Sequence, residues 1–282
     1  MSEKRVPFLA VLGLAQLVVL LPIGLLDPMK FSDDGWFQRS HAIAIVLGCG
    51  FAQASVAAAW MALGPLQLRV RGPGSAAWVL LAATLLAINI AVNSPRSDEG
   101  VLLGASFVGV WLFVQAPLWL ARGIYRLRLE PWTDSNPFAI VGEHQFGIRQ
   151  LLVVTAAVAM SLGFGRLMIL GFSPNQRLLA FGGPHVEMIV IVGLFIICNS
   201  LVAFTVITGA LLPRHWLFAV ALGCCAASVI TLAEWNLFAK LVGGPGKWQS
   251  LLIIGGMNGL QFCWLLLNLL AVRLAGYRLM SR

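Results

Sequence analysis

Long apolar runs separated by short polar segments follow one another along almost the whole sequence. Crossing the roughly 30 Å hydrocarbon core of a bilayer takes about 17 to 25 residues of helix, and each run is long enough to do so. The runs cover residues 8–26, 42–63, 76–92, 101–121, 148–170, 186–212, 216–238 and 251–272. Because they are too long and too continuous for barrel strands, they predict an all-α polytopic membrane helix bundle with about eight transmembrane helices.

The composition agrees with this interpretation. Hydrophobic residues make up 59% of the 282 residues and charged residues only 11%, whereas roughly a quarter of the residues of a soluble domain are charged. Tryptophans also stand near the ends of the runs, where aromatic rings favour the membrane interface; these are Trp36, Trp78, Trp216 and Trp248. A soluble protein is therefore excluded.

The basic residues are divided unequally between alternate loops. Twelve fall on the side that holds both termini: Lys4, Arg5, Arg69, Arg71, Arg122, Arg126, Arg128, Arg149, Arg214, Arg273, Arg278 and Arg282. Six fall on the other side: Lys30, Arg39, Arg96, Arg177, Lys240 and Lys247. Cytoplasmic loops carry the excess of Lys and Arg, so we expect both termini to be cytoplasmic, which requires an even number of spans. A net charge of +8 spread over short loops does not predict a nucleic-acid partner.

The two halves of the chain resemble each other. Aligning Gly48 with Gly193 without a gap also matches Ser55 with Ser200, Ala58 with Ala203 and Gly64 with Gly209. The fourth and eighth runs end alike, in RGIYRL at 122–127 and RLAGYRL at 273–279. We therefore predict a 4+4 parallel repeat about an axis along the membrane normal, with halves at 1–125 and 148–282 and a cytoplasmic linker at 126–147.

The longest loop, at residues 126–145, lies between the two halves. Pro131, Pro137 and the TDSN segment between them predict irregular structure or short turns. Trp132 and Phe138 could contact the membrane surface or a protein partner. The simpler interpretation is a solvated connector.

The segment FGIRQLLVVTAAVA at 146–159 leads into the fifth run. It resembles a motif of uncharacterised multi-spanning membrane proteins of planctomycete bacteria, F-S-I/L-R-x-L-L-x-x-T-x-x-x-A, in FGIRQLL at 146–152 and in Thr155 and Ala159. Gly147 departs from the usual serine. The resemblance implies a multi-pass protein of a bacterial inner (cytoplasmic) membrane and carries no activity.

Two ionisable residues lie well inside apolar runs, Arg166 in the fifth and Glu234 in the seventh. Both stand roughly 10 Å beyond the midplane towards the outside. A charge near the bilayer centre costs about 2.5 to 3.5 kcal/mol, which an opposite charge at the same depth offsets. We predict a direct or water-bridged Arg166–Glu234 pair, serving as a clamp or, alternatively, as a gate or a substrate-binding charge. The competing interpretation has each side chain reaching the external headgroups separately.

Side-chain amides form a second polar group near the midplane: Gln16, Gln53, Asn199, Asn258 and Gln261. Amides facing lipid are costly, so we expect them to face the bundle interior and to form interhelical hydrogen bonds. The alternative is a polar path for a small solute. The segment GGMNG places Gly255 and Gly259 one helical turn apart and predicts close helix approach.

Motifs of known chemistry are missing from the sequence, which contains no HExxH, GxGD, GxSxG, Walker A or GxGxxG pattern. The five cysteines lie inside the runs without CxxC spacing, which is typical of packing residues. The four histidines lie at run ends or in loops. We therefore expect no cofactor, no metal site and no enzymatic activity.

The function predicted from these features is that of an integral membrane protein with a structural role, or of a subunit of a membrane complex. The alternative is a small-solute permease whose polar site contains Arg166, Glu234, Asn199, Gln53 and Gln261. The expected partners are the lipid bilayer and a protein that contacts the 126–145 loop.

Overall fold

The computed structural model of the chain describes residues 16, 18, 36–64, 67–93, 97–125, 127–131, 184–211, 216–241, 248–274 and 277–281. The predicted fifth run at 148–170, the FGIRQLL motif and Arg166 lie outside these residues. The predicted first run lies outside them too, apart from residues 16 and 18.

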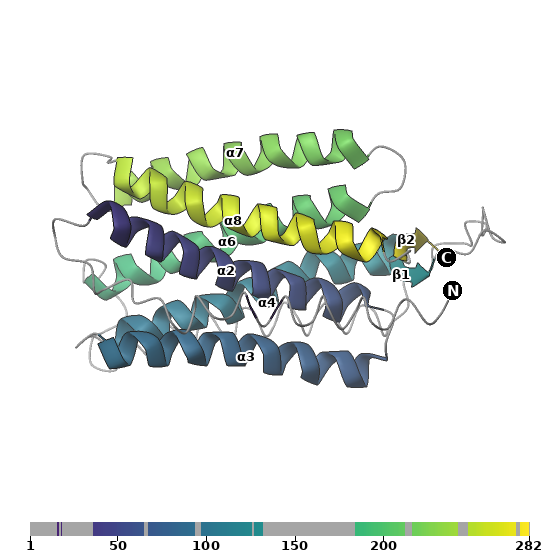
Figure 1. The fold of residues 1–282 in the computed structure, drawn as a ribbon, viewed down its shortest axis with the longest axis horizontal. Helices are drawn as coiled ribbons and strands as arrows, with labels where there is room; N and C mark the ends of the chain where they lie inside the picture. The colour runs from purple at the N-terminus through teal and green to yellow at the C-terminus, as the bar shows by residue number, and fades with distance from the viewer. Residues whose placement is uncertain are drawn as a thin grey trace.

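Six of the predicted runs coincide with helices in the described part of the chain (Figure 1). These helices are α2 (Trp36–Leu63), α3 (Leu68–Asn93), α4 (Ser97–Tyr125), α6 (Pro184–Leu211), α7 (Trp216–Leu241) and α8 (Trp248–Leu274). Four segments within them are long and apolar enough to cross a membrane: His41–Leu63, Leu68–Asn89, Leu103–Gly123 and Ser250–Leu274. They indicate a helix bundle of the membrane type, as the hydrophobic pattern predicts.

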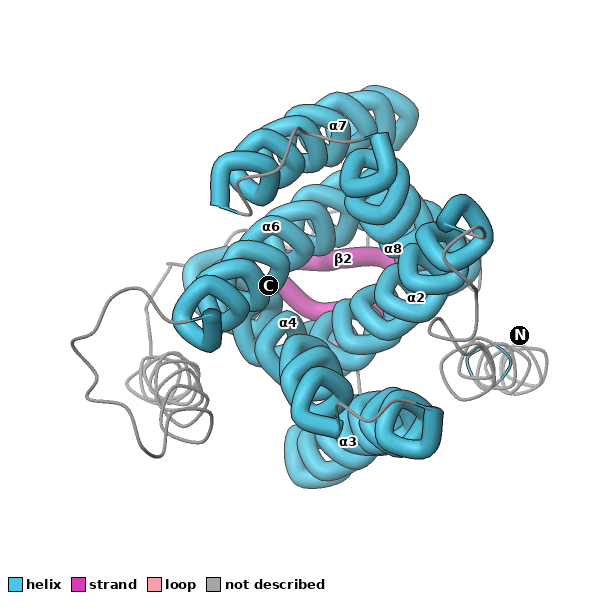
Figure 2. The backbone as a smooth tube through the Cα atoms, turned by 90° about the vertical axis from the view of Figure 1, so that its left-hand side faces the viewer, coloured by secondary structure: helices cyan, strands magenta, loops and turns pink. Residues whose placement is uncertain are grey.

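Of the six described helices, four form the centre of the bundle and two lie outside it (Figure 2). The helices α2, α4, α6 and α8 surround one axis, and each contacts the next around the ring. Helix α3 packs against the outer side of α2 and α4, and α7 packs against the outer side of α6 and α8. The four central helices run in one direction and the two outer helices run in the opposite direction.

A short antiparallel sheet lies where α4 and α8 finish, and we call this end of the bundle the strand end (Figure 1). Strand β1 (Leu127–Pro131) follows α4 and strand β2 (Tyr277–Ser281) follows α8, with Leu127 opposite Ser281. The prediction of irregular structure is therefore wrong for residues 127–131. The partner strand comes from a distant part of the sequence, which no local pattern in the loop reveals.

Arginines gather at the strand end; in the described segments these are Arg69, Arg71, Arg122, Arg128, Arg273 and Arg278. Nη1 of Arg71 donates to the Gly64 carbonyl, and Nη1 of Arg122 donates to the Ala62 carbonyl. Their guanidinium groups lie 5.6 and 5.1 Å from the ring centroid of Trp119. Carbonyls at a helix C-terminus lack intrahelical partners and attract cations, so these arginines cap α2.

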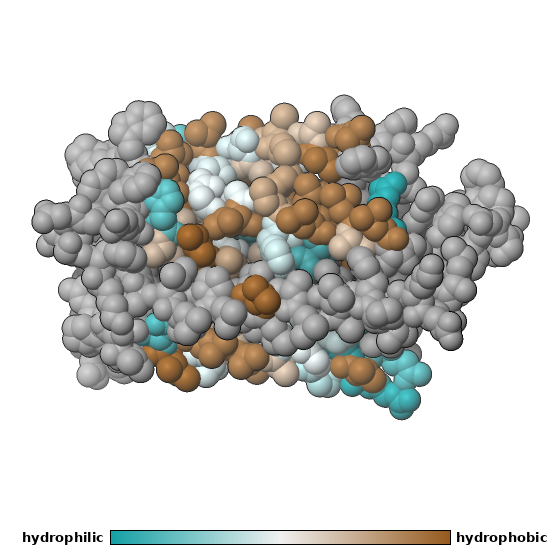
Figure 3. All heavy atoms as spheres, in the orientation of Figure 1, coloured by the Kyte–Doolittle hydropathy of each residue, from teal (hydrophilic) through white to brown (hydrophobic). Residues whose placement is uncertain are grey.

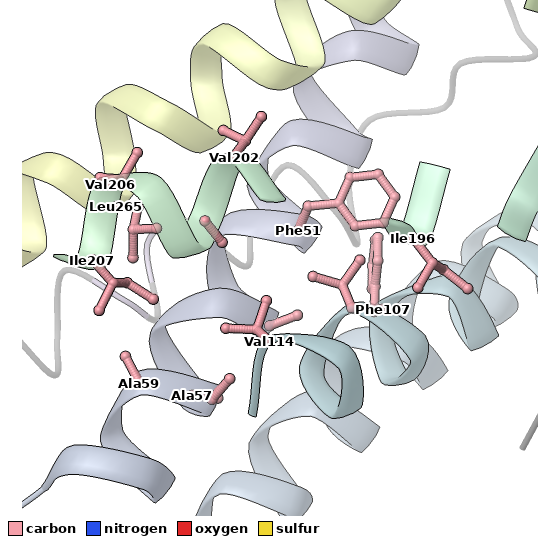
Figure 4. Close-up of a cluster of buried hydrophobic side chains, with 14 of the residues drawn as sticks. Phe51, Ala57, Ala59, Phe107, Val114, Ile196, Val202, Val206, Ile207 and Leu265 are labelled. Atoms are coloured by element: carbon pink, nitrogen blue, oxygen red, sulfur yellow. The ribbon is translucent and has the colours of Figure 1, made fainter. Parts of the chain in front are cut away.

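The apolar core lies between the four central helices (Figure 4). Phe51 of α2 and Phe107 of α4 are fully buried and meet edge to face, with ring centroids 5.4 Å apart. Val114 of α4, Ile196 of α6 and Leu265 of α8 belong to the same cluster. The core therefore joins helices from both halves of the sequence.

Close approach between α2 and α8 depends on glycines other than the predicted pair. A Cβ added to Gly48 of α2 would come within 2.9 Å of α8 atoms, and one added to Gly256 would come within 2.9 Å of the Ala44 Cβ. Among the described residues, a Cβ on Gly259 would meet nothing within 4 Å, and one on Gly255 only a methyl group at 3.9 Å. Among the described residues, close approach to α8 therefore occurs at Gly256 and not at the predicted pair Gly255 and Gly259. One position along a helix turns the contact face by roughly 100°, and a uniformly apolar sequence does not mark that face.

Large apolar side chains are exposed on the outward faces of the helices. On α7 they include Leu217, Val229, Leu232 and Leu237, and on α3 they include Leu80, Leu81 and Ile88. In Figure 3, apolar side chains occupy much of the visible surface that the described residues form. Such an apolar surface is suited to contact with lipid tails, whereas a surface of exposed polar groups is not.

Candidate functional site

A stacked pair of aromatic rings shows which residues of α6 and α7 lie at the same height in the bundle. Phe195 of α6 and Phe238 of α7 stack with their ring centroids 6.0 Å apart. The two helices are antiparallel neighbours. One turn closer to the strand end lie Asn199, four residues after Phe195, and Glu234, four residues before Phe238. Asn199 and Glu234 therefore lie at the same level on adjacent helices.

Glu234 is buried between α7 and its neighbours. Asn258 Nδ2 donates to Glu234 Oε2 at 2.7 Å and to Thr231 Oγ1 at 3.0 Å. The interpretation in which Glu234 extends outward on its own is therefore wrong, because its side chain is 0% exposed and bonds to α8.

Gln261 of α8 joins three helices. Its Nε2 donates to Ser55 Oγ of α2 at 2.9 Å and to the Asn199 backbone carbonyl of α6 at 3.0 Å. Gln261 stands three residues after Asn258, so the two side chains are about one turn apart on α8. We call Glu234, Asn258, Gln261 and Asn199 the α6–α7–α8 cluster.

Gln53 bonds to a different set of residues. Trp78 Nε1 donates to Gln53 Oε1 at 2.9 Å, and Gln53 Nε2 donates to the Gln16 backbone carbonyl at 3.4 Å. Gln16 Nε2 donates to Asn268 Oδ1, and Gln16 Oε1 accepts a 3.2 Å bond from Trp264 Nε1. These contacts connect α2, α3 and α8 with residue 16 of the predicted first run.

The structure brings together three of the five predicted site residues. Glu234, Asn199 and Gln261 belong to the α6–α7–α8 cluster, whereas Gln53 is held by Trp78 and Gln16. Arg166 lies outside the described residues, so its pairing with Glu234 stays a prediction. The expectation that the amides face inward is confirmed, because Gln53, Asn199 and Gln261 are each 0% exposed.

Sequence reasoning missed the residues that hold these groups in place. Asn258 is predicted as a midplane amide but not as the partner of Glu234, although it stands one turn from Gln261. Ser55 is marked only by its match with Ser200 in the aligned halves, and Thr231 only by its position one turn before Glu234. Hydroxyl side chains within helices commonly bond to their own backbone, so their interhelical contacts are not visible in a sequence.

Four oxygen atoms of the cluster lack a hydrogen-bond partner in the part of the chain that the structure describes. They are Glu234 Oε1, Asn258 Oδ1, Asn199 Oδ1 and Gln261 Oε1. A buried polar atom without a partner costs about 1 to 3 kcal/mol, and more when it is charged. Because these four oxygens accept no hydrogen bond, the cluster has more hydrogen-bond acceptors than donors among the described residues.

Within the described residues, no three His, Cys, Asp or Glu side chains gather as they would around a transition metal. The cysteines described there are free thiols. The fold and the cluster define an α-helical membrane bundle with a polar interior and a buried carboxyl group. Comparisons with models of protein families, with curated proteins and with solved structures gave no match to the chain.

Proposed function

We propose that the chain is an integral protein of a bacterial inner membrane that has a structural role or is a subunit of a membrane complex, without catalytic activity. The closed packing of the polar interior carries this proposal. Gln53, Asn199, Glu234 and Gln261 are fully buried and take part in hydrogen bonds between helices. Such bonds contribute about 0.6 kcal/mol each in a membrane, so the network favours one arrangement of the helices.

The charge distribution supports a cytoplasmic strand end. The arginines described at the strand end include Arg71 and Arg122. Asp98, Glu99 and Lys240 lie at the other end of the bundle, where α4 begins and α7 ends. Because basic residues are retained on the cytoplasmic side, this arrangement favours cytoplasmic termini.

The directions of the helices support the proposal of eight spans. Helix α4 ends at the strand end, whereas α6 begins at the opposite end and runs in the same direction. A fifth span at 148–170 would return the chain across the membrane. A first span at 8–26 would then give the even number that cytoplasmic termini require.

The packing order supports a parallel repeat of the halves 1–125 and 148–282. Helix α3 packs outside α2 and α4 as α7 packs outside α6 and α8. The strands that follow the fourth and eighth runs also pair with each other, as equivalent segments beside a two-fold axis can do. The halves differ in detail, because Gly48 packs closely against α8, whereas a Cβ on the aligned Gly193 would meet no described atom within 4 Å.

Two interactions complete the proposal. Arg166 would pair with Glu234 and clamp the fifth span to α7, because a charge partner offsets much of the cost of a buried carboxylate. A protein partner would contact the 126–145 loop from the cytoplasm. The lipid bilayer would surround the apolar outer faces.

A small-solute permease is the second candidate, and one observation favours it. The four acceptor oxygens without partners in the α6–α7–α8 cluster are groups that a polar solute could bind. A permease would need a path by which water reaches these atoms.

The accessibility of Cys198 separates the two candidates. Cys198 is buried on α6 directly before Asn199, so it is a native probe once the other four cysteines are replaced by alanine. In a closed bundle, a membrane-impermeant methanethiosulfonate should modify Cys198 only after denaturation in SDS. In a permease with an open path, it should modify Cys198 in intact membranes.

A cysteine at Gln67 provides the matched control. Gln67 is exposed between α2 and α3 at the strand end, so Gln67→Cys in the cysteine-free chain should react readily in inverted vesicles. If Cys198 reacts as fast as this control, from either side of the membrane, the closed bundle is contradicted and the permease is favoured.

A further inference from the structure

The hydrogen bonds of the α6–α7–α8 cluster determine which way its amides point. Asn199 Nδ2 donates to the Phe195 carbonyl at 2.8 Å, and Gln261 Nε2 donates to the Asn199 carbonyl at 3.0 Å. A carbonyl oxygen only accepts, so the amide nitrogens must face these carbonyls. The amide oxygens of Asn199 and Gln261 are therefore turned away from the bonds that hold the side chains.

Donors that could satisfy these oxygens are also missing from their surroundings in the described residues. The buried side-chain nitrogens of Trp111, Gln115 and Trp235 lack hydrogen-bond partners themselves, so they do not reach the cluster. Asn258 Nδ2 is already used by Glu234 Oε2 and Thr231 Oγ1. What the cluster requires is a positive charge or a donor that the described side chains do not supply.

We propose that the cluster binds a monovalent cation of the sodium class through Glu234 Oε1 and the amide oxygens of Asn258, Asn199 and Gln261. Carboxylate and carbonyl oxygens are hard ligands, which hard cations prefer to nitrogen or sulfur. One such ion takes several oxygen ligands, so it satisfies acceptors on three helices at once.

The connectivity brings the first two ligands near each other. The 2.7 Å hydrogen bond joins Asn258 Nδ2 to Glu234 Oε2. Asn258 Oδ1 is bonded to the same carbon as Nδ2, and Glu234 Oε1 is bonded to the same carbon as Oε2. Bond lengths therefore hold the two oxygens within about 7 Å of each other. To share one ion, the carboxyl group or the amide must turn, and this lengthens or breaks the hydrogen bond between them. Gln261 lies about one turn along α8, and Asn199 lies at the level of Glu234 on α6.

The charge of the site selects a monovalent ion. Glu234 is the acidic member of the cluster, and the other three ligands are neutral amides. A monovalent cation therefore neutralises the site, whereas a divalent cation would leave a positive charge buried in a low-dielectric interior. Protein sites for divalent calcium commonly use several carboxylates.

This inference goes beyond the proposed function, because a cation held inside a closed bundle stabilises it without being transported. It also competes with the predicted Arg166–Glu234 pair, in which a guanidinium group would occupy the same place. Failure to bind an ion would not change the Cys198 labelling result, so the two proposals fail separately.

Thermal unfolding of the purified full chain in detergent tests the cation site. The unfolding temperature is measured in sodium, potassium, lithium or choline chloride at constant ionic strength. Relative to choline, sodium should raise it saturably, by about 5 to 10 °C once the concentration is roughly a hundred times the Kd. Equilibrium binding of radioactive ²²Na⁺ should saturate at one ion per chain.

Three variants connect this effect to the cluster. Glu234→Gln removes the charged ligand with little change of shape, and Asn258→Leu removes a neutral one. Both should lose ²²Na⁺ binding and the sodium-dependent rise. Asn236→Ala is the control on the same helix, because Asn236 is exposed and donates to the Leu232 carbonyl at 2.8 Å; it should behave as the unaltered chain.

Several outcomes would overturn the site. Equal unfolding temperatures in sodium and choline, together with no bound ²²Na⁺, would exclude it. An unfolding temperature that follows pH but not sodium would assign the oxygens to a proton. A sodium effect that persists in Glu234→Gln would place the ion elsewhere in the protein. If sodium raises the unfolding temperature only in Arg166→Gln, the Arg166 guanidinium group and not an ion occupies the site in the unaltered chain.

Discussion

At the scale of the residue, Glu234 is accommodated by its neighbours and not by access to the headgroups. Asn258 bonds one carboxyl oxygen, and Thr231 accepts the second hydrogen of the same amide. Counting along the sequence finds the carboxyl group and its approximate depth. It does not identify Asn258 as the partner, because the partner depends on which face of α8 meets α7.

The predicted pair of Arg166 and Glu234 can be tested by a double-mutant cycle. Glu234→Gln should lower the unfolding temperature in detergent, because breaking a buried pair leaves an uncompensated charge and costs about 3 to 5 kcal/mol. Adding Arg166→Gln should restore part of the loss.

The same cycle distinguishes the two sources of positive charge. Coupling between the two substitutions supports the guanidinium group, and strictly additive losses count against the predicted pair. Asn236→Ala combined with Arg166→Gln is the matched control, because Asn236 is exposed on α7 and should show no coupling.

At the scale of the element, small residues on α2 let the central helices approach each other. Gly50 faces the fully buried Phe107 of α4, and a Cβ added to Gly50 would overlap the Cζ tip of the phenyl ring. Phe107 is in turn held against Phe51 of α2. The ring therefore cannot move aside without disturbing the core.

Gly50→Ala should lower the free energy of unfolding by about 1 to 3 kcal/mol, because it overpacks a filled core. Gly193→Ala on α6 is the matched control, since a Cβ there would meet none of the residues that the structure describes within 4 Å. Alanine is the better helix former by about 1 kcal/mol, so the control should be neutral or stabilising. Unfolding in SDS titrations measures both variants, and equal effects would contradict the packing of α2 against α4.

At the scale of the whole molecule, the paired strands connect the ends of the two halves. The sequence shows that the fourth and eighth runs end alike, and the structure places the segments after them side by side, with Leu129 opposite Leu279. Repeated sequence therefore indicated which segments are equivalent. It did not indicate that they form a sheet.

Leu129→Cys and Leu279→Cys in the cysteine-free chain should form a disulfide under mild oxidation. Register partners in an antiparallel pair have Cα atoms about 4.5 to 5.5 Å apart, which is within the range of a disulfide. A protease site inserted between residues 132 and 147 lets a gel detect the bond, because cross-linked halves stay joined after cleavage. The pair Leu127→Cys and Leu279→Cys, two residues out of register, should cross-link much less; equal cross-linking of both pairs would contradict the register.

The sequence by itself determined the membrane class, the positions of the six described helices and the inward orientation of the amides. These follow from local properties, because a bilayer demands long apolar helices and excludes unpaired amides from lipid. The choice among Gly255, Gly256 and Gly259, the bond between Asn258 and Glu234, and the pairing of β1 with β2 were decided only by the tertiary structure. Each depends on the rotation of one helix against another, or on segments far apart in the chain, and a uniformly apolar sequence does not encode these relations locally.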